Sequence, residues 1–141
     1  MAIDFGEKRL GVAVSDVTGT LALPVTVISR AGKSKDLKVL SDLINKYKVE
    51  KIIVGNPLTL AGRVGPQSQI ATEFARLVES AFNMPVETTD ERLSTAEARR
   101  RLSEAGIDER NQRGKIDQIA ASLILQNYLD RQAGGFTDKP I

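Results

Sequence analysis

Acidic residues in three separate parts of the chain have the type and placement that metal-dependent chemistry requires. Asp4 ends a short apolar run, and Asp90 and Glu91 end another, "PVETT". Asp117 precedes apolar residues at helical spacing, so it shares a helix face with Ala120, Ala121, Ile124 and Tyr128. A carboxylate on an apolar face needs an ion pair or a bound cation if it is buried. Each acid also has a structural alternative: Asp4 as a turn residue, the second pair as a solvated loop, and Asp117 as a first-turn acid that the helix dipole favours.

Carboxylates that cluster repel one another and have raised pKa values unless a cation holds them. Hard cations such as Mg²⁺ and Mn²⁺ prefer oxygen ligands. The chain has no His and no Cys, which excludes a Ser-His-Asp triad and a zinc site built on those ligands. Two such ions about 4 Å apart cleave phosphodiesters, because one activates water and the other stabilises the leaving oxygen.

The composition is that of a globular protein, and its charge is compatible with an anionic partner. The 141 residues suffice for one domain, and 20 basic residues give a net charge of +2 and a pI near 9.0. With no Trp and 4% aromatic residues, recognition of a nucleic acid is expected to depend on backbone charge and shape rather than on stacked bases. No apolar run approaches the roughly 20 residues of a membrane span, so we expect a cytoplasmic protein without a membrane partner.

The elements that must position these acids follow from apolar patterning. Strands are predicted over Ala2–Asp4, Leu10–Ser15, Leu21–Ile28, Lys51–Gly55 and Pro85–Asp90. Helices are predicted over 36–47, 67–81, 94–105 and 115–129, with Glu104–Lys115 as a polar linker. Pro24 cannot donate to a strand ladder, which places the third strand at a sheet edge or a bulge.

The helix patterns also predict which side chains face the core. In the first helix these are Leu37, Leu40, Leu43, Ile44 and Tyr47, and in the second they are Ile70, Phe74, Leu77, Val78 and Ala81.

This order predicts an α/β protein of ribonuclease H-like fold. Its mixed five-stranded sheet contains an antiparallel meander of three strands plus two parallel strands, and helices flank it. We expect a single domain over residues 1–131 and a flexible C-terminal tail over 132–141. Open α/β sheets bind ligands at the carboxyl ends of their strands, which is where Asp4 and one of Asp90 and Glu91 fall.

Four motifs in order resemble the YqgF family. They are "AIDFGEKRLGVAVSD", "KIIVGNPLTLAG", "DERLSTAEARRRL" and "KIDQIAASLILQNYLD", and the match runs from about Ala2 to Arg131. Proteins of this family are described as Holliday-junction resolvases and as pre-16S rRNA nucleases. The resemblance implies that Asp4, Glu91 and Asp117 are the catalytic residues and the ligands of Mg²⁺ or Mn²⁺, with two ions expected. The resemblance, and not the spacing, selects Glu91 over Asp90.

The chain departs from the family pattern at three positions. Glu7 stands where the family commonly has Thr or Ser, which adds an acid near the expected site. Asn56 and Thr59 replace residues that are more often apolar and Asn, respectively.

Basic residues flank the acidic motifs, and we expect them to contact nucleic acid. Those expected to bind phosphates are Lys8, Arg9, Arg92, Arg113 and Lys115. The alternative for each is a solvated surface charge.

The expected activity is that of a metal-dependent nuclease acting on structured nucleic acid, as a monomer or a homodimer. Processing of the 5′ end of pre-16S ribosomal RNA is the expected reaction, and cleavage of four-way DNA junctions is the alternative; the residues themselves do not separate the two. Two other classes stay open. "DFGEKRLG" also looks like the first phosphate loop of actin-like and sugar-kinase ATPases, and a non-catalytic RNA-binding module is the remaining possibility.

Overall fold

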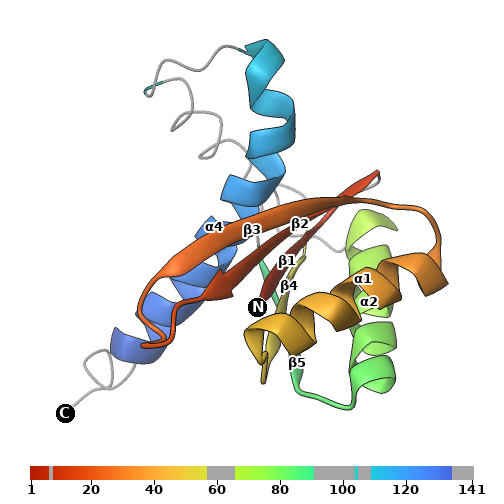
Figure 1. Cartoon of the computed structure of the whole chain (residues 1–141), viewed down its shortest axis with the longest axis horizontal. Coiled ribbons are helices and arrows are strands. Elements are labelled where there is room, and N and C mark those ends of the chain that lie inside the picture. Colours follow the sequence, from red (N-terminus) through yellow and green to blue (C-terminus); the bar gives the residue numbers. More distant parts are fainter. Residues whose placement is uncertain (7, 57–65, 91–103, 105–108, 135–141) are drawn as a thin grey trace.

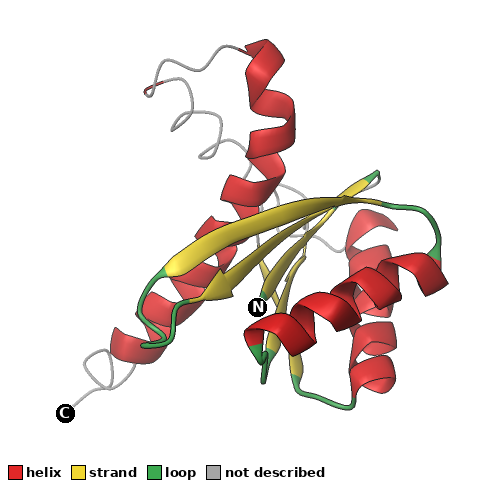
Figure 2. Cartoon of the chain, in the orientation of Figure 1, coloured by secondary structure: helices red, strands yellow, loops and turns green. Residues whose placement is uncertain are grey.

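A twisted five-stranded sheet forms the centre of the protein, with helices on both faces (Figures 1 and 2). The computed structural model describes residues 1–6, 8–56, 66–90, 104 and 109–134, with the side chains at 56, 66–68, 90 and 109–117 left out. The strands are β1 Ala2–Phe5, β2 Arg9–Ser15, β3 Ala22–Ser29, β4 Ile52–Asn56 and β5 Val86–Asp90. The helices are α1 Lys33–Tyr47, α2 Pro66–Phe82 and α4 Glu109–Gly134.

The sheet has the mixed topology that the sequence predicts, in the order β3-β2-β1-β4-β5. β1, β2 and β3 pair antiparallel, whereas β1 with β4 and β4 with β5 pair parallel. β3 is an edge strand, and its register against β2 shifts between Val12 and Ala13, where Ala13 lies opposite Pro24. The prediction for Pro24 is therefore confirmed. Because β1, β3, β4 and β5 run in the same direction, their carboxyl ends meet at one edge of the sheet.

The main core fills one face of the sheet, beneath α1 and α2. Alternate residues of the central strands, such as Ile3, Leu10 and Val54, pack there against Leu40 of α1 and Val78 of α2. All five are completely buried. This face supplies most of the apolar burial that stabilises the fold.

Three of the predicted inward positions are wrong. Tyr47 is 40% exposed and Ile70 41% exposed, and Ala81 is also exposed. α2 is longer than the strands it contacts, because 17 residues at roughly 1.5 Å each exceed the five residues of β4 or β5 at roughly 3.3 Å each. Ile70 and Ala81 lie near its two ends, and Tyr47 is the last residue of α1.

α4 covers the opposite face, where small residues allow close approach. Ala2, Ala13 and Ile53 of the strands pack against Ala121 and Ile124 of the helix. The side chain of Gln126 also ties α4 to the start of β3: its Oε1 accepts from the Ala22 N–H at 2.9 Å, and its Nε2 donates to the Thr20 carbonyl at 2.9 Å.

The last helix is longer than the sequence pattern predicts. α4 begins at Glu109 rather than Lys115 and ends at Gly134 rather than Leu129, so the polar linker over Glu104–Lys115 is wrong for its second half. The added N-terminal turns extend beyond the sheet in Figure 1. The added residues carry no apolar periodicity in the sequence, and Glu, Arg and Gln are good helix formers.

Some expectations concern residues outside the description. The helix predicted over 94–105 lies there except for Glu104, which is helical, and of the expected tail only 132–134 is described, as the end of α4. No helix in the described part of the chain is long and apolar enough to span a membrane.

Candidate functional site at the carboxyl edge of the sheet

Asp4 lies in the central strand, near the edge where the carboxyl ends meet. It is only 8% exposed. Alternation along β1 places it on the α4 face with Ala2, because Ile3 and Phe5 pack into the opposite core. A buried carboxylate is costly unless it is hydrogen-bonded or bound to a cation, which fits Asp4 better to a site than to an exposed turn.

Glycines flank Asp4 on both neighbouring strands. Asp4 pairs with Gly11 on β2, and on the other side Ile3 pairs with Val54, so that Asp4 stands level with Gly55. Neither glycine has a side chain to cover the carboxylate. The two neighbouring strand positions therefore contribute no side chain beside Asp4 on the α4 face.

The turn that follows Asp4 is tightly closed. The Gly6 N–H donates to the Arg9 carbonyl at 2.9 Å. A Cβ added at Gly6 would lie 2.7 Å from that same carbonyl oxygen, which only a backbone shift would relieve. Glycine is therefore required at position 6, and the close turn holds the chain beside Asp4 in one place.

Arg30 braces this turn from the end of β3. Its Nη1 donates to the Gly6 carbonyl at 3.1 Å, and its guanidinium lies 4.6 Å from the centroid of the Phe5 ring. The Phe5 ring in turn packs on Phe74 of α2, with centroids 4.6 Å apart. Sequence reasoning missed Arg30, because a single basic residue after a strand looks like ordinary surface charge until the strand order is known.

The other predicted residues divide into two groups. Lys8 and Arg9 are exposed at the β1–β2 turn, beside Asp4 along the chain. Asp90 ends β5 opposite Asn56 of β4, at the expected edge.

The second group falls on parts that the structure does not describe. Glu91, Arg92, Glu7 and Thr59 lie outside the described residues. Asp117, Arg113 and Lys115 belong to α4, but their side chains are among those left out.

Metal binding therefore stays a prediction. Among the described residues no group of three His, Cys, Asp or Glu side chains is placed to hold a metal ion. Of the three predicted ligands, only the Asp4 side chain belongs to that part of the chain.

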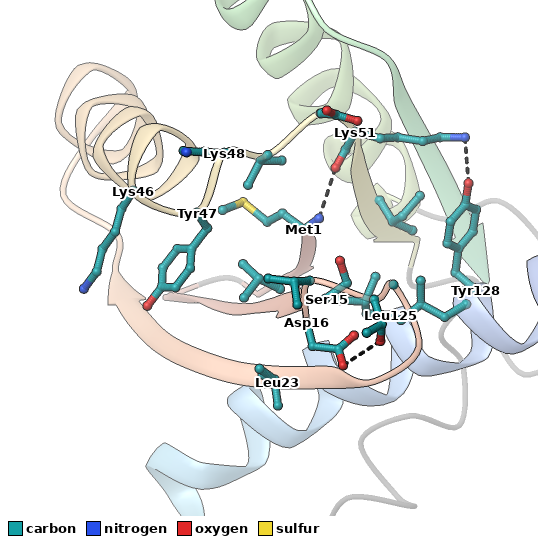
Figure 3. A pocket seen from close by; sticks show the side chains of 18 residues that line it. Met1, Ser15, Asp16, Leu23, Lys46, Tyr47, Lys48, Lys51, Leu125 and Tyr128 are labelled. Atoms are coloured by element: carbon teal, nitrogen blue, oxygen red, sulfur yellow. Dashed lines mark hydrogen bonds between the residues drawn. The ribbon is translucent and has the colours of Figure 1, made fainter.

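A hollow of about 880 Å³ lies at the opposite end of the sheet. It is lined by Met1, Tyr47 and Tyr128 among others (Figure 3). Lys51 Nζ donates to the Tyr128 hydroxyl at 2.8 Å there. This hollow adjoins the amino ends of β1 and β4, whereas ligands of open α/β sheets bind at carboxyl ends, so size does not make it the candidate site.

Burial and hydrogen bonds shift the pKa values of groups around this hollow. Burial lowers the pKa of the Met1 amino group from 8.0 to about 6. The pKa of Asp16 is lowered chiefly because its carboxylate accepts from the N–H groups of Thr20 and Leu21. The hydroxyl of Tyr128, followed by the carboxylate of Glu87, raises the pKa of Lys51. These groups lie at the end of the sheet away from Asp4.

Comparison with known sequences gives one consistent family. The family model described as "RuvX: Holliday junction resolvase" matches residues 1–131. A protein of Halothermothrix orenii named "Putative pre-16S rRNA nuclease" is 44% identical over 132 residues, which cover 94% of each chain. A Thermoanaerobacter pseudethanolicus protein of the same name is 45% identical over 133 residues, 94% of this chain and 96% of that one.

Solved structures confirm the fold class. Thermus thermophilus RuvC in complex with a Holliday junction substrate matches with a TM-score of 0.56 at 15% identity, covering 94% of this chain and 93% of that one. A second Thermus thermophilus RuvC structure matches with a TM-score of 0.50 at 14% identity, covering 94% of each chain. The mixed sheet flanked by helices is thus the ribonuclease H-like fold that the sequence predicts.

Proposed function

The chain belongs to the RuvX family, the YqgF family of the motif resemblance, and we propose that it is a nuclease that hydrolyses phosphodiester bonds in structured nucleic acid. One observation carries the proposal: a buried aspartate stands at the carboxyl edge of the central strand with a glycine on either side. Family membership favours this activity over an ATP-binding domain and over a passive RNA-binding module.

We propose Asp4, Glu91 and Asp117 as the ligands of Mg²⁺ or Mn²⁺, with two ions as the expected number. The donor set fits, since carboxylate oxygens are what these cations prefer and the positions level with Asp4 on both neighbouring strands are glycines. When bound, such ions activate water and stabilise the leaving oxygen of a phosphodiester.

The spacing of α4 against β1 supports the place of Asp117 in this set. Position 117 precedes Ala121 by four residues, or roughly 6 Å of helix, and Ala121 packs in the cluster that contains Ala2. Asp4 follows Ala2 by two residues, or roughly 7 Å of strand. Because α4 ends beside the start of β3, its N-terminal direction leads toward the carboxyl edge. Positions 117 and 4 therefore lie at similar distances from the cluster that contains Ala121 and Ala2, and both lie on its carboxyl-edge side.

The end of β5 supports the proposal for Glu91. Asp90 pairs with Asn56 at the carboxyl end of β4, the edge that Asp4 approaches, and Glu91 follows Asp90 in the sequence. This position supports either acid of the "DER" motif near the site, and the family resemblance supports Glu91.

Within the site, the chain's own residues have separable tasks. Asp4 supplies a carboxyl group at a fixed position, since its strand is paired on both sides. Lys8 and Arg9, exposed on the adjoining turn, supply the positive charge that phosphates require, with Arg92, Arg113 and Lys115 proposed in the same role.

We propose the 5′ end of pre-16S ribosomal RNA as the substrate, because the relatives at 44% and 45% identity carry that name. The setting would be the cytoplasm, with the protein acting as a monomer or a homodimer. A four-way DNA junction is the second candidate, favoured by the description of the family model.

One experiment tests both substrates. The wild-type protein is incubated with labelled pre-16S RNA and with a labelled four-way DNA junction, in Mg²⁺, in Mn²⁺ and in EDTA. We expect cleavage of the RNA that needs a divalent ion. Cleavage of the junction alone would reverse the substrate assignment, and cleavage in EDTA would overturn the metal-dependent mechanism.

A further inference from the structure

Four exposed cations line the carboxyl edge on the β3 side of Asp4. Lys8 and Arg9 belong to the β1–β2 turn, Arg30 follows β3, and Lys33 begins α1. We call these four residues the basic strip. Arg30 braces the Gly6 turn, and neither it nor Lys33 has a substrate-binding role in the site proposed above.

Backbone contacts hold the strip together. The Arg30 N–H donates to the Lys8 carbonyl at 2.9 Å, and Arg9 pairs with Ser29, the residue before Arg30. Arg30 and Lys33 line one hollow of about 100 Å³, together with the Phe5 ring. Arg30 and Lys33 thus lie on the α1–α2 side of the carboxyl edge, whereas Asp4 faces α4, and backbone pairing places Lys8 and Arg9 next to the end of β3.

Arg30 is held in place from both sides. Its guanidinium lies on the Phe5 ring and donates to the Gly6 carbonyl, while the next residue, Ala31, donates its N–H to the carboxylate of Asp36 at 2.9 Å. Asp36 is only 6% exposed. A cation fixed in this way loses little conformational entropy when it contacts a phosphate, and a guanidinium suits the geometry of phosphate oxygens.

Two described acids lie near the strip. Asp36 accepts the Ala31 N–H, and Glu73 of α2 lines the hollow beside Lys33. Among the described residues, two acids thus stand beside four cations, and Glu7, next to Lys8 in the sequence, lies outside them. Lys33 is also unfavourable for its own helix, since a cation in the first turn opposes the helix dipole.

We propose that the basic strip binds the phosphodiester backbone of the nucleic acid on the β3 side of Asp4, with Arg30 and Lys33 contacting phosphates beyond the scissile one. This inference rests on the proposed function, because it takes the Asp4 edge as the site of cleavage. The contacts are to the backbone, so they add affinity and orientation without sequence preference.

The test measures binding in the cleavage-deficient D4N background, so that substrate is not consumed. Two labelled probes are used, an RNA stem with single-stranded ends and a four-way DNA junction, each titrated from low to physiological salt. The variants are R30Q and K33Q, with R30K and K33R retaining the charge. K46Q is the matched control, because Lys46 lies in the last turn of α1, roughly 20 Å from Lys33 along the same helix.

We expect R30Q and K33Q each to weaken binding several-fold at low salt, and to reduce the slope of log K against log salt by about 0.7 to 0.9, the value of one phosphate contact. The charge-retaining variants and K46Q should keep the parent slope. Thermal unfolding of each variant shows that it is folded at the assay temperature.

Unchanged affinity and slope in both R30Q and K33Q would contradict phosphate binding by the basic strip. An equal loss of affinity and slope in K46Q would contradict it too. A response to one probe alone identifies the nucleic acid that it takes. The two proposals fail separately, because binding is measured without cleavage: a D4N protein that still cleaves contradicts the nuclease site, whereas unaltered slopes beside a D4N defect contradict the strip alone.

Discussion

The sharpest prediction compares the two buried carboxylates of the described core, Asp4 and Asp36. They are 8% and 6% exposed, respectively, so burial does not distinguish them. Their surroundings do. Asp36 accepts the N–H of Ala31 in the first turn of α1, which is a structural task, whereas Asp4 stands between glycines at the carboxyl edge. The change of Asp to Asn keeps the size of the side chain and removes its charge, so it separates the two roles.

The expected effect of D4N on cleavage follows from the lost charge. Unit charges about 4 Å apart interact by about 4 kcal/mol at an effective dielectric constant of 20. At about 1.4 kcal/mol per factor of ten, D4N should slow single-turnover cleavage by about a thousandfold. Its thermal midpoint in EDTA should change by less than about 4 °C, because volume and backbone pairing are kept.

D36N should show the opposite pattern. Its amide oxygen still accepts from Ala31, but the favourable charge in the first turn of α1 is gone, which costs about 0.3 to 1 kcal/mol of unfolding free energy. Cleavage should stay close to the wild-type rate. Single-turnover rates and urea unfolding of the three proteins provide the comparison.

Two results would refute this reasoning. If D4N cleaves as fast as the wild type, Asp4 is not part of the site. If D36N loses as much activity as D4N, the loss of cleavage comes from removing a buried charge from the fold, and not from the position of Asp4 at the carboxyl edge.

Three further predictions concern the scaffold. G6A should lower both the thermal midpoint and cleavage, because the new Cβ would lie 2.7 Å from the Arg9 carbonyl oxygen; an unchanged midpoint would contradict the tight turn. A121L should cost about 1 to 3 kcal/mol in urea unfolding, since overpacking separates α4 from Ala2, and a stability gain would show unfilled space. In a protein whose first residue is Met1, the unfolded chain binds more protons between pH 6 and 8.0 than the folded one, because burial lowers the amino pKa to about 6. Its unfolding free energy should therefore rise by up to about 3 kcal/mol over that range, and a flat urea-unfolding profile would contradict the burial.

Local patterning predicted most of the fold correctly, because each strand carries its own signal. The apolar runs over Ala2–Asp4 and Lys51–Gly55 predicted buried strands, and Pro24 alone indicated an edge or bulge in β3. The start of α4 was missed for the opposite reason, because its first residues carry no apolar periodicity.

Part of the candidate site was predictable in the same way. A carboxylate that ends a strand is visible in sequence, so Asp4 was found, as were the neighbouring cations Lys8 and Arg9. Arg30 was not, since its importance comes from contacts with Gly6 and the Phe5 ring, which belong to a segment 24 residues away in the chain.

The sequence by itself determined the chemistry that this protein has at its disposal. Without His or Cys it has carboxylates, cations and hydroxyls to work with, and its motif order identified the family. Only the tertiary structure decided where those groups stand. Strand order put Gly11 and Gly55 beside Asp4 and brought the end of β3 to the same edge, because hydrogen-bonded pairing between distant segments depends on the whole sheet and not on any one strand.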